Sequence, residues 1–279
     1  MHDDDYGNIY HGDGPILMAA PHIGTFVPEA LMLQPAWSAI QGRLADPTGF
    51  VLRAVAEARG LTSIAARHHP CVVDCNVLAD RRPLSPGLAH ANLCRTHTSD
   101  GEPLYGHGEG PSEDEIARRV ACYWRPYHHA LAGELRRLRS AHDHVLLLIS
   151  HASGWLSPYR QQAGTYDCNV GTHHGSSCDR RLVSALTRTV QHAGRSWVVN
   201  GKCADVFPAQ HYGMPDSGIH VMEVEFAGNW RKACELEPAV THTTAALFGA
   251  MLDDLLATLT TLPKSSSAPH PDLTFNLYG

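Results

Sequence analysis

The chain has 279 residues, of which 43% are hydrophobic and 18% charged, and this is enough to bury a sizeable core in one large domain. The net charge of -6 comes without any basic block, so the composition argues against nucleic-acid binding and favours small-molecule chemistry. No apolar run approaches the ~20 residues of a membrane span and the first residues are acidic, unlike a signal peptide, so we expect a cytoplasmic protein without a membrane partner.

Histidine and cysteine are both frequent. The 20 histidines permit metal binding but do not demonstrate it. The 8 cysteines include no C-x-x-C pair, so we expect most of them to be buried thiols and not a disulfide scaffold.

Three strands are predicted in the first third of the chain. The apolar run at residues 15–21 is followed at once by His22. Two shorter apolar runs, at residues 63–67 and 71–74, also have the length of strands, and the second runs into Asp74 and Asn76. Histidine, carboxylate and amide groups therefore follow predicted strand ends.

Helix signals separate these strands. Asp46 and Pro47 have the pattern of an N-cap and first turn, and Gly60 closes that helix. Residues 83–110 are rich in Gly, Pro and His and predict a long irregular loop of the kind that often binds ligands. A capping box at residues 112–115 then opens a long amphipathic helix, which Pro126 should kink or interrupt.

The clearest strand of the chain is the apolar run at residues 145–149, which stops at Ser150 and His151. Such a run fits a strand that is buried on both faces, as in a parallel sheet covered by helices. In open α/β sheets, functional groups lie just beyond the carboxyl ends of strands, so His151 is a candidate site residue.

The second half continues the alternation. Residues 166–175 predict a glycine-punctuated loop, and His211 falls in a later loop. The remaining predicted elements are a helix from the Asp179 cap to Gly194, a strand at 196–200 ending in Asn200, a buried strand at 218–226 with Glu225, and a helix from Thr241 to Leu259. We therefore predict an α/β three-layer sandwich with a mostly parallel central sheet, in a single domain of residues 1–262 followed by a tail at 263–279.

The predicted strand ends suggest metal-assisted chemistry. Two histidines with a carboxylate are a common catalytic zinc set, with one position open for water. A further glutamate near such a metal can accept the proton of the water and pass it to a departing amine. The candidates are far apart in the sequence, so no compact motif supports the metal by itself.

The sequence resembles the N-formylglutamate amidohydrolase family from about Tyr10 to Trp230. The matching stretches include Gly-Asp-Gly-Pro-Ile-Leu at 12–17, Pro-His-Ile-Gly at 21–24, Val-Val-Asp-Cys-Asn at 72–76, Tyr-Trp-Arg-Pro-Tyr-His at 123–128, Asn-Val-Gly-Thr at 169–172, His-Tyr-Gly at 211–213 and Gly-Ile-His-Val-Met-Glu-Val-Glu at 218–225. The resemblance implies the fold of zinc carboxypeptidases and aspartoacylases. It also implies a divalent metal, most simply Zn²⁺, with His22 and His151 at ligand positions and Glu225 as general base.

Several motif residues of the family are replaced. Where the family has Asp-Leu-Asn-Arg this chain has Asp-Cys-Asn-Val at 74–77, and where it has Asp-Ala-His-Ser this chain has Ile-Ser-His-Ala at 149–152. The first change removes an arginine suited to gripping a carboxylate, and the second removes an acidic neighbour that can orient His151. Thr-Asp-Trp becomes Pro-Thr-Gly at 47–49, which removes an acidic candidate for the third metal ligand. Gly-Gly-Tyr-Ile-Thr-Arg becomes Asp-Val-Phe-Pro-Ala-Gln at 205–210, which removes a second arginine, and Asn-Asp-Gly becomes His-His-Gly at 173–175.

These departures predict a changed substrate. Asn76 and Asn200 are candidate substrate-binding residues, and Arg81, Arg82 or Lys202 can replace the missing arginines from displaced positions. We expect an amidohydrolase that acts on an amide or N-acyl group of a small molecule, with poor activity on N-formylglutamate. A non-catalytic relative that binds a ligand or partner, and a metal site used for non-hydrolytic chemistry, are the alternatives.

Two assignments stay open at this point. Asp46 is the nearest surviving acid for a third metal ligand, but helix capping explains it equally well. Glu225 with His211 can supply proton transfer and oxyanion stabilisation. Alternatively, Glu225 pairs with Arg119 or Arg125 and anchors its strand.

Overall fold

A computed structural model describes residues 5–79, 93–98, 102–106, 110–152, 166–201, 207–227, 230–231, 234 and 238–265. Within these ranges, seven strands form one mixed sheet in the order β1-β3-β2-β4-β7-β5-β6. The strands are β1 (Gly7–Tyr10), β2 (Ile16–Ala20), β3 (Thr62–Ala66), β4 (Val145–Ser150), β5 (Cys168–Gly171), β6 (Trp197–Val199) and β7 (Ile219–Phe226). No helix in the described ranges is long and apolar enough to cross a membrane.

The sheet is parallel at its centre and antiparallel at its flanks. β3, β2, β4 and β7 run in one direction, whereas β1 pairs antiparallel with β3 and β5 pairs antiparallel with β7. β6 is parallel to β5 and therefore opposite to β7. The central strands are buried along their whole length, as expected for a sheet covered on both faces.

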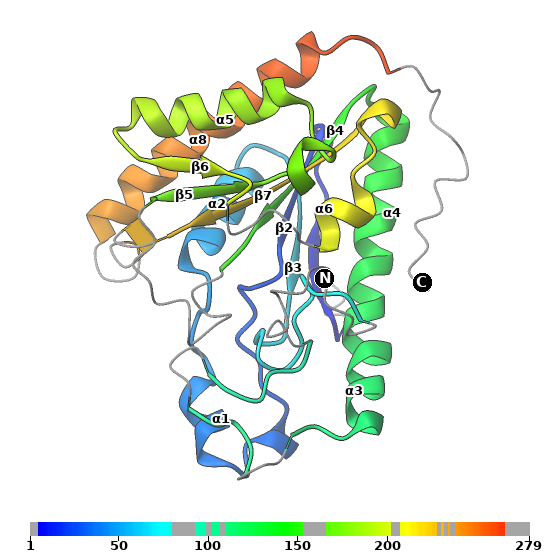
Figure 1. Cartoon of the computed structure of the whole chain (residues 1–279), viewed down its shortest axis with the longest axis vertical. Helices are drawn as coiled ribbons and strands as arrows, with labels where there is room; N and C mark the ends of the chain where they lie inside the picture. The colour runs from blue at the N-terminus through cyan, green and yellow to red at the C-terminus, as the bar shows by residue number, and fades with distance from the viewer. Residues whose placement is uncertain are drawn as a thin grey trace.

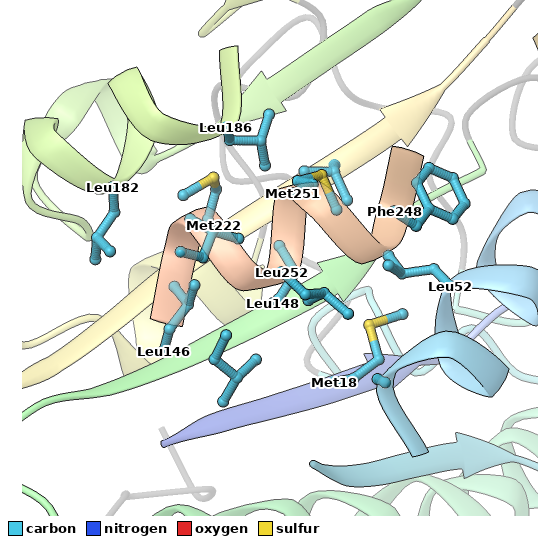
Figure 2. Close-up of a cluster of buried hydrophobic side chains, with 14 of the residues drawn as sticks. Met18, Leu52, Leu146, Leu148, Leu182, Leu186, Met222, Phe248, Met251 and Leu252 are labelled. Atoms are coloured by element: carbon cyan, nitrogen blue, oxygen red, sulfur yellow. The ribbon is translucent and has the colours of Figure 1, made fainter. Parts of the chain in front are cut away.

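Helices cover both faces, so the predicted three-layer α/β architecture is confirmed (Figure 1). The helices are α1 (Pro35–Ile40), α2 (Pro47–Glu57), α3 (Glu113–Arg119), α4 (Arg125–Ala141), α5 (Arg180–His192), α6 (Phe207–Tyr212) and α8 (Pro238–Thr261), with single turns at Glu29–Leu31, His173–Gly175 and Pro215–Ser217. One face carries α2, α5 and α8, whose apolar side chains pack on alternate residues of the strands, as Figure 2 shows for Leu148, Met222 and Leu252.

The opposite face carries α4 and α6. Its core is built from Tyr127, Leu131 and Leu135 of α4, Phe207 and Tyr212 of α6, and the other set of alternate strand residues, among them Leu147, Ile149 and Val221. We call this side of the sheet the α4 face. It is the face on which the polar side chains described below converge.

The helix caps predicted from the sequence are confirmed. Asp46 caps α2 by accepting a hydrogen bond from the Gly49 N–H, and Ser112 caps α3 by accepting one from the Glu115 N–H. Pro126 does interrupt its helix: a π-helical segment at Val120–Trp124 separates α3 from α4. A wider turn at that place accommodates a proline that lacks an N–H and crowds the preceding carbonyls.

Three predictions about elements are wrong. Residues 71–74 form a turn and not a strand, and Cys71 and Val72 fill a small satellite core with Trp37 and Leu104. The predicted loop at 166–175 contains β5, and the predicted loop around His211 contains α6. A buried apolar run such as 71–74 fits a strand or a packed turn alike, and the glycines near β5 and α6 do not exclude short regular elements.

Candidate active site

The candidate site lies where β2, β4 and β7 end, on the α4 face. His22 follows β2 and His151 follows β4, and the two imidazole ring centroids are 5.3 Å apart. The loop carrying His22 lies against the chain that leaves β3, because Gly24 has no side chain there: a Cβ would lie 2.2 Å from the carbonyl oxygen of His68. The two predicted metal-binding histidines are therefore brought together by parallel neighbouring strands.

His22 is held on both ring nitrogens. The N–H of Ala152 donates to Nδ1 at 3.1 Å, so the ring proton lies on Nε2, which donates to Asp74 Oδ1 at 2.8 Å. Asp74 Oδ2 accepts from the guanidinium of Arg95 at 2.9 Å, and Oδ1 also accepts from the backbone N–H of Asn76. Burial acts to raise the pKa of Asp74, but His22, Arg95 and the Asn76 N–H together hold it well below its usual range, so this carboxyl group is ionised.

His151 belongs to a second cluster with Asn76 and Glu223. Asn76 Nδ2 lies 2.9 Å from His151 Nδ1 and 3.0 Å from Glu223 Oε2, and Glu223 Oε2 lies 3.7 Å from His151 Nδ1. An amide nitrogen can only donate, so His151 Nδ1 accepts and its ring proton lies on Nε2. Glu223 is fully buried, and burial raises its pKa to about 8, so it is mainly a neutral acid at pH 7.

Glu225 lies two residues beyond Glu223 on the same face of β7. Its strand partner across the antiparallel ladder is Asn169 of β5, whose Nδ2 donates to Glu225 Oε2 at 3.0 Å. Arg119, one of the two arginines considered as its partner, instead donates to Glu115, the carbonyl of Val72 and the Tyr105 hydroxyl. The buried carboxyl of Glu225 is thus placed by an amide on the next strand.

Asp46 lies close behind His151 but on the other face of the sheet. Its Oδ1 accepts from the Gly49 N–H and the Thr48 hydroxyl, and its Oδ2 accepts from the hydroxyl of Ser150, the residue before His151. Both carboxylate oxygens are thus engaged in capping α2 and in tying that helix to β4. The capping role offered by the sequence accounts for the burial of Asp46.

α6 is fixed beside the site by a buried histidine. His128 Nε2 donates to the carbonyl of Cys75 at 2.9 Å, and its Nδ1 accepts from the Tyr212 hydroxyl at 2.8 Å. His211, the preceding residue, is half-buried and stacks on Phe207, and burial lowers its pKa. α6 and the Asp74–Asn76 turn are therefore locked to α4 together.

Asn200 does not follow a strand that ends at the same edge of the sheet as β2, β4 and β7. β6 runs opposite to β4 and β7, so its carboxyl end does not share their edge. The Asn200 side chain is bonded to Thr172, and its backbone is left-handed with φ of 53°. Arg81, Arg82 and Lys202 lie outside the described residues, as does most of the loop predicted at 83–110.

Glu223, Asn169 and Arg95 were not among the predicted site residues. A signal for Glu223 existed, because Glu223 and Glu225 are two residues apart in a strand and must share a face. Asn169 opens one of the stretches that match the family but lies in a segment predicted as a loop, and Arg95 lies in an irregular segment to which no pattern pointed.

A divalent metal fits the described residues in part. The two imidazoles are soft enough donors for zinc, and the carboxylate of Asp74 behind His22 is the kind of partner that metal-binding histidines have. Asn76 Oδ1 and Glu223 Oε1 are buried oxygens without a hydrogen-bond partner among the described residues. No group of three or more His, Cys, Asp and Glu side chains in the described ranges is arranged to hold a metal, and His22 would bind one only by giving up one of its two ring hydrogen bonds.

The chain is similar to proteins of one family over most of its length. The model of the family described as N-formylglutamate amidohydrolase matches residues 14–229. N-formylglutamate deformylase of Pseudomonas aeruginosa is 32% identical over 262 residues, which cover 91% of this chain and 97% of that protein. The deformylase of Pseudomonas putida is 32% identical over 226 residues, covering 79% and 82% of the two chains.

Solved structures agree on the fold. The crystal structure of N-formylglutamate amidohydrolase from Ralstonia eutropha superposes with a TM-score of 0.70 at 18% identity, over 89% of this chain and 98% of that one. A gene product of Agrobacterium tumefaciens superposes with a TM-score of 0.57 at 17% identity, over 88% and 94%.

Proposed function

The chain belongs to the N-formylglutamate amidohydrolase family, and we propose that it hydrolyses an amide or N-acyl bond of a small amino-acid-like molecule other than N-formylglutamate. The observation that carries this proposal is the buried cluster at the ends of β2, β4 and β7. There His22, Asp74, Asn76 and His151 form one connected hydrogen-bond network beside two strand carboxyl groups. Such groups are costly to bury and are characteristic of catalytic sites.

The changed substrate is inferred from the surroundings of that network. The residue after Asn76 is Val77, a half-buried aliphatic side chain that cannot bind a carboxylate. Arg95, which contacts the cluster among the described residues, already binds Asp74. A substrate with fewer carboxylates than N-formylglutamate therefore suits the described residues better.

A substrate panel tests this inference. We expect N-formylglutamate to be hydrolysed poorly and an N-acyl or amide compound with an apolar or neutral side chain to be hydrolysed at a higher kcat/KM. The measurement is release of free amine from equal concentrations of N-formylglutamate, N-formylglutamine, N-formylleucine and their N-acetyl counterparts. Deformylation of N-formylglutamate at ordinary enzyme rates, with kcat/KM of roughly 10⁴ M⁻¹s⁻¹ or more, contradicts the changed substrate.

We further propose Zn²⁺ or a similar divalent ion between His22 and His151. When bound, such an ion polarises a carbonyl and lowers the pKa of a water molecule. The side chains of the protein carry out the proton transfer. Glu225 accepts one proton from the attacking water and gives it to the nitrogen of the breaking C–N bond, so that an acid and an amine leave. His211 on α6 is proposed to stabilise the charge that develops on the carbonyl oxygen.

Removal of either histidine tests the metal. We expect about one divalent ion per purified chain, and we expect His22→Ala and His151→Ala to lose it while keeping the far-ultraviolet circular dichroism of the wild type. His192→Ala is the matched control, because His192 is exposed on α5 and far from the cluster in the fold. Full metal content in both site variants, or none in the wild type after reconstitution with zinc, rules out this assignment.

A second candidate function is ligand binding without catalysis. One observation favours it: both imidazoles already accept hydrogen bonds on Nδ1, from the Ala152 N–H and from Asn76, so the network is closed without a metal. That candidate predicts no turnover of any compound in the panel and no stoichiometric metal.

A further inference from the structure

His151 has no acidic neighbour on its own strand, since residue 149 is isoleucine. The structure places a carboxyl group there from a different strand. Ile149 of β4 and Glu223 of β7 are direct partners in the parallel ladder, so their side chains leave the sheet on the same face. Ile149 packs into the apolar core of the α4 face, whereas Glu223 lies 3.7 Å from His151 Nδ1.

We propose that Glu223 is a positioning residue for His151, which it orients through the side-chain amide of Asn76. Asn76 gives one amide proton to His151 Nδ1 and the other to Glu223 Oε2. If Glu223 Oε2 did not accept this second hydrogen bond, the side-chain amide of Asn76 could rotate and turn its nitrogen away from His151. The orientation of His151 thus depends on Glu223, to which it is linked by two successive hydrogen bonds through Asn76. This inference rests on the proposed site at His22 and His151.

Asn76 and Glu223 can also accept a hydrogen bond from His151 when its ring proton lies on Nδ1. If Nε2 binds a metal or another acceptor, Nδ1 carries the proton and needs an oxygen beside it. Asn76 Oδ1 and Glu223 Oε1 have no hydrogen-bond partner among the described residues, and both belong to this cluster. Two buried oxygens of this kind cost stability in the absence of such a role.

Because the Glu223 carboxyl group is costly to bury, a leucine substitution separates a positioning role from a purely structural one. Glu223 is fully buried next to apolar side chains of β4 and β7, so leucine fits the space and removes a carboxyl group that is expensive to bury. If Glu223 only held the fold together, Glu223→Leu would lower stability. If Glu223 positions His151, Glu223→Leu keeps or raises the melting temperature and disturbs the imidazole of His151.

The experiment reads the imidazole of His151 directly. Full-length chain labelled with ¹⁵N-histidine is examined by long-range ¹H–¹⁵N correlation without metal, and His151→Ala assigns the signals. We expect the wild type to show a single ring form with the proton on Nε2. In Glu223→Leu we expect shifted or doubled ring signals and a zinc affinity reduced about 10- to 100-fold in a chelator competition. Glu223→Gln keeps an acceptor for Asn76 Nδ2 and should restore most of the wild-type spectrum.

Glu134→Leu is the matched control. Glu134 is a buried glutamate on α4 that binds Arg137 near the amino ends of β2 and β3, at the other end of the sheet. We expect it to lower the melting temperature without changing the His151 signals. Unchanged His151 signals in a folded Glu223→Leu chain, or an equal change in Glu134→Leu, overturn the proposal.

Two further measurements distinguish a failure of the Glu223 role from a failure of the proposed metal site. If Glu223→Leu does not fold, Asn76→Ala removes the intermediate link and must disturb the His151 signals in the same way, and an unchanged spectrum again overturns the proposal. If the wild type binds no zinc, the proposed metal fails, but the ring spectra of the metal-free chains still decide the role of Glu223.

Discussion

Glu225→Gln is expected to lower kcat by about a hundredfold or more, because glutamine cannot accept the proton of the attacking water. Glutamine keeps the size of the side chain, and its carbonyl oxygen can still accept the hydrogen bond that Asn169 Nδ2 donates to Glu225 Oε2. Zinc content and the melting temperature should therefore stay close to those of the wild type. Because the lost interaction belongs to the transition state, KM should change much less than kcat.

The structural alternative predicts the opposite pattern. If Glu225 mainly anchored β7 through a charged partner, the neutral glutamine would lower the melting temperature and leave turnover largely intact. Steady-state kinetics on the best substrate of the panel, together with thermal unfolding, separates the two accounts. Glu134→Gln is a matched control, since it neutralises a buried glutamate at the other end of the sheet. Retained turnover in a folded Glu225→Gln chain removes Glu225 from the mechanism.

Long apolar runs and cap residues were enough to predict the frame of this protein. β2, β4 and β7 are buried on both faces, so their continuous apolar runs read clearly as central strands. Asp46 and Ser112 occupy cap positions in which a side-chain oxygen satisfies a free backbone N–H. Both signals are local, and tertiary packing did not override them.

The pattern of strand ends predicted the grouping of these residues partly for the wrong reason. Asp74 and Asn76 do lie beside His22 and His151, but they follow a packed turn and not a strand. That turn is fixed from outside its own sequence, by the hydrogen bond from His128 to the carbonyl of Cys75 and by Arg95 on Asp74. Contacts between residues so distant in the sequence leave no periodic signal.

Strand direction and the choice between two glutamates also lay beyond the sequence. Asn200 ends a strand as predicted, but β6 runs opposite to β7, and direction depends on the whole topology. Glu223 and Glu225 share one face of β7, and only the neighbours tell them apart. Asn76 and His151 lie beside Glu223, whereas Asn169 lies beside Glu225.

We expect a steep loss of stability between about pH 6.5 and pH 4, because four buried histidines are neutral in the fold. Burial lowers the pKa of His68 and His220 to about 4 and that of His69 and His128 to about 3. In the unfolded chain these groups have a pKa near 6.5, so below that value the unfolded chain binds more protons. Their contribution is therefore fully present above pH 6.5 and is lost as the pH falls.

Glu223 acts in the opposite direction, since its raised pKa of about 8 means that the fold holds a proton that the unfolded chain releases above about pH 4.5. Four histidines less one glutamate leave three net protons, which corresponds to a slope of about 4 kcal/mol per pH unit between roughly pH 4.5 and 6. A typical stability of about 5–15 kcal/mol would be lost within a few pH units. Above pH 6.5 only the Glu223 contribution remains, so maximum stability is expected near pH 6.5–7.

Urea unfolding at pH 7, 6 and 5 measures this slope, with the free energy of unfolding extrapolated to water at each pH. His128→Gln tests the origin of the effect, because glutamine can keep hydrogen bonds to the Cys75 carbonyl and the Tyr212 hydroxyl but cannot take up a proton. This variant should lose about 1.4 kcal/mol per pH unit of the slope. His192→Gln, at an exposed position on α5, is the matched control. A free energy of unfolding that is flat from pH 7 to pH 5 would show that these histidines are not held neutral by burial.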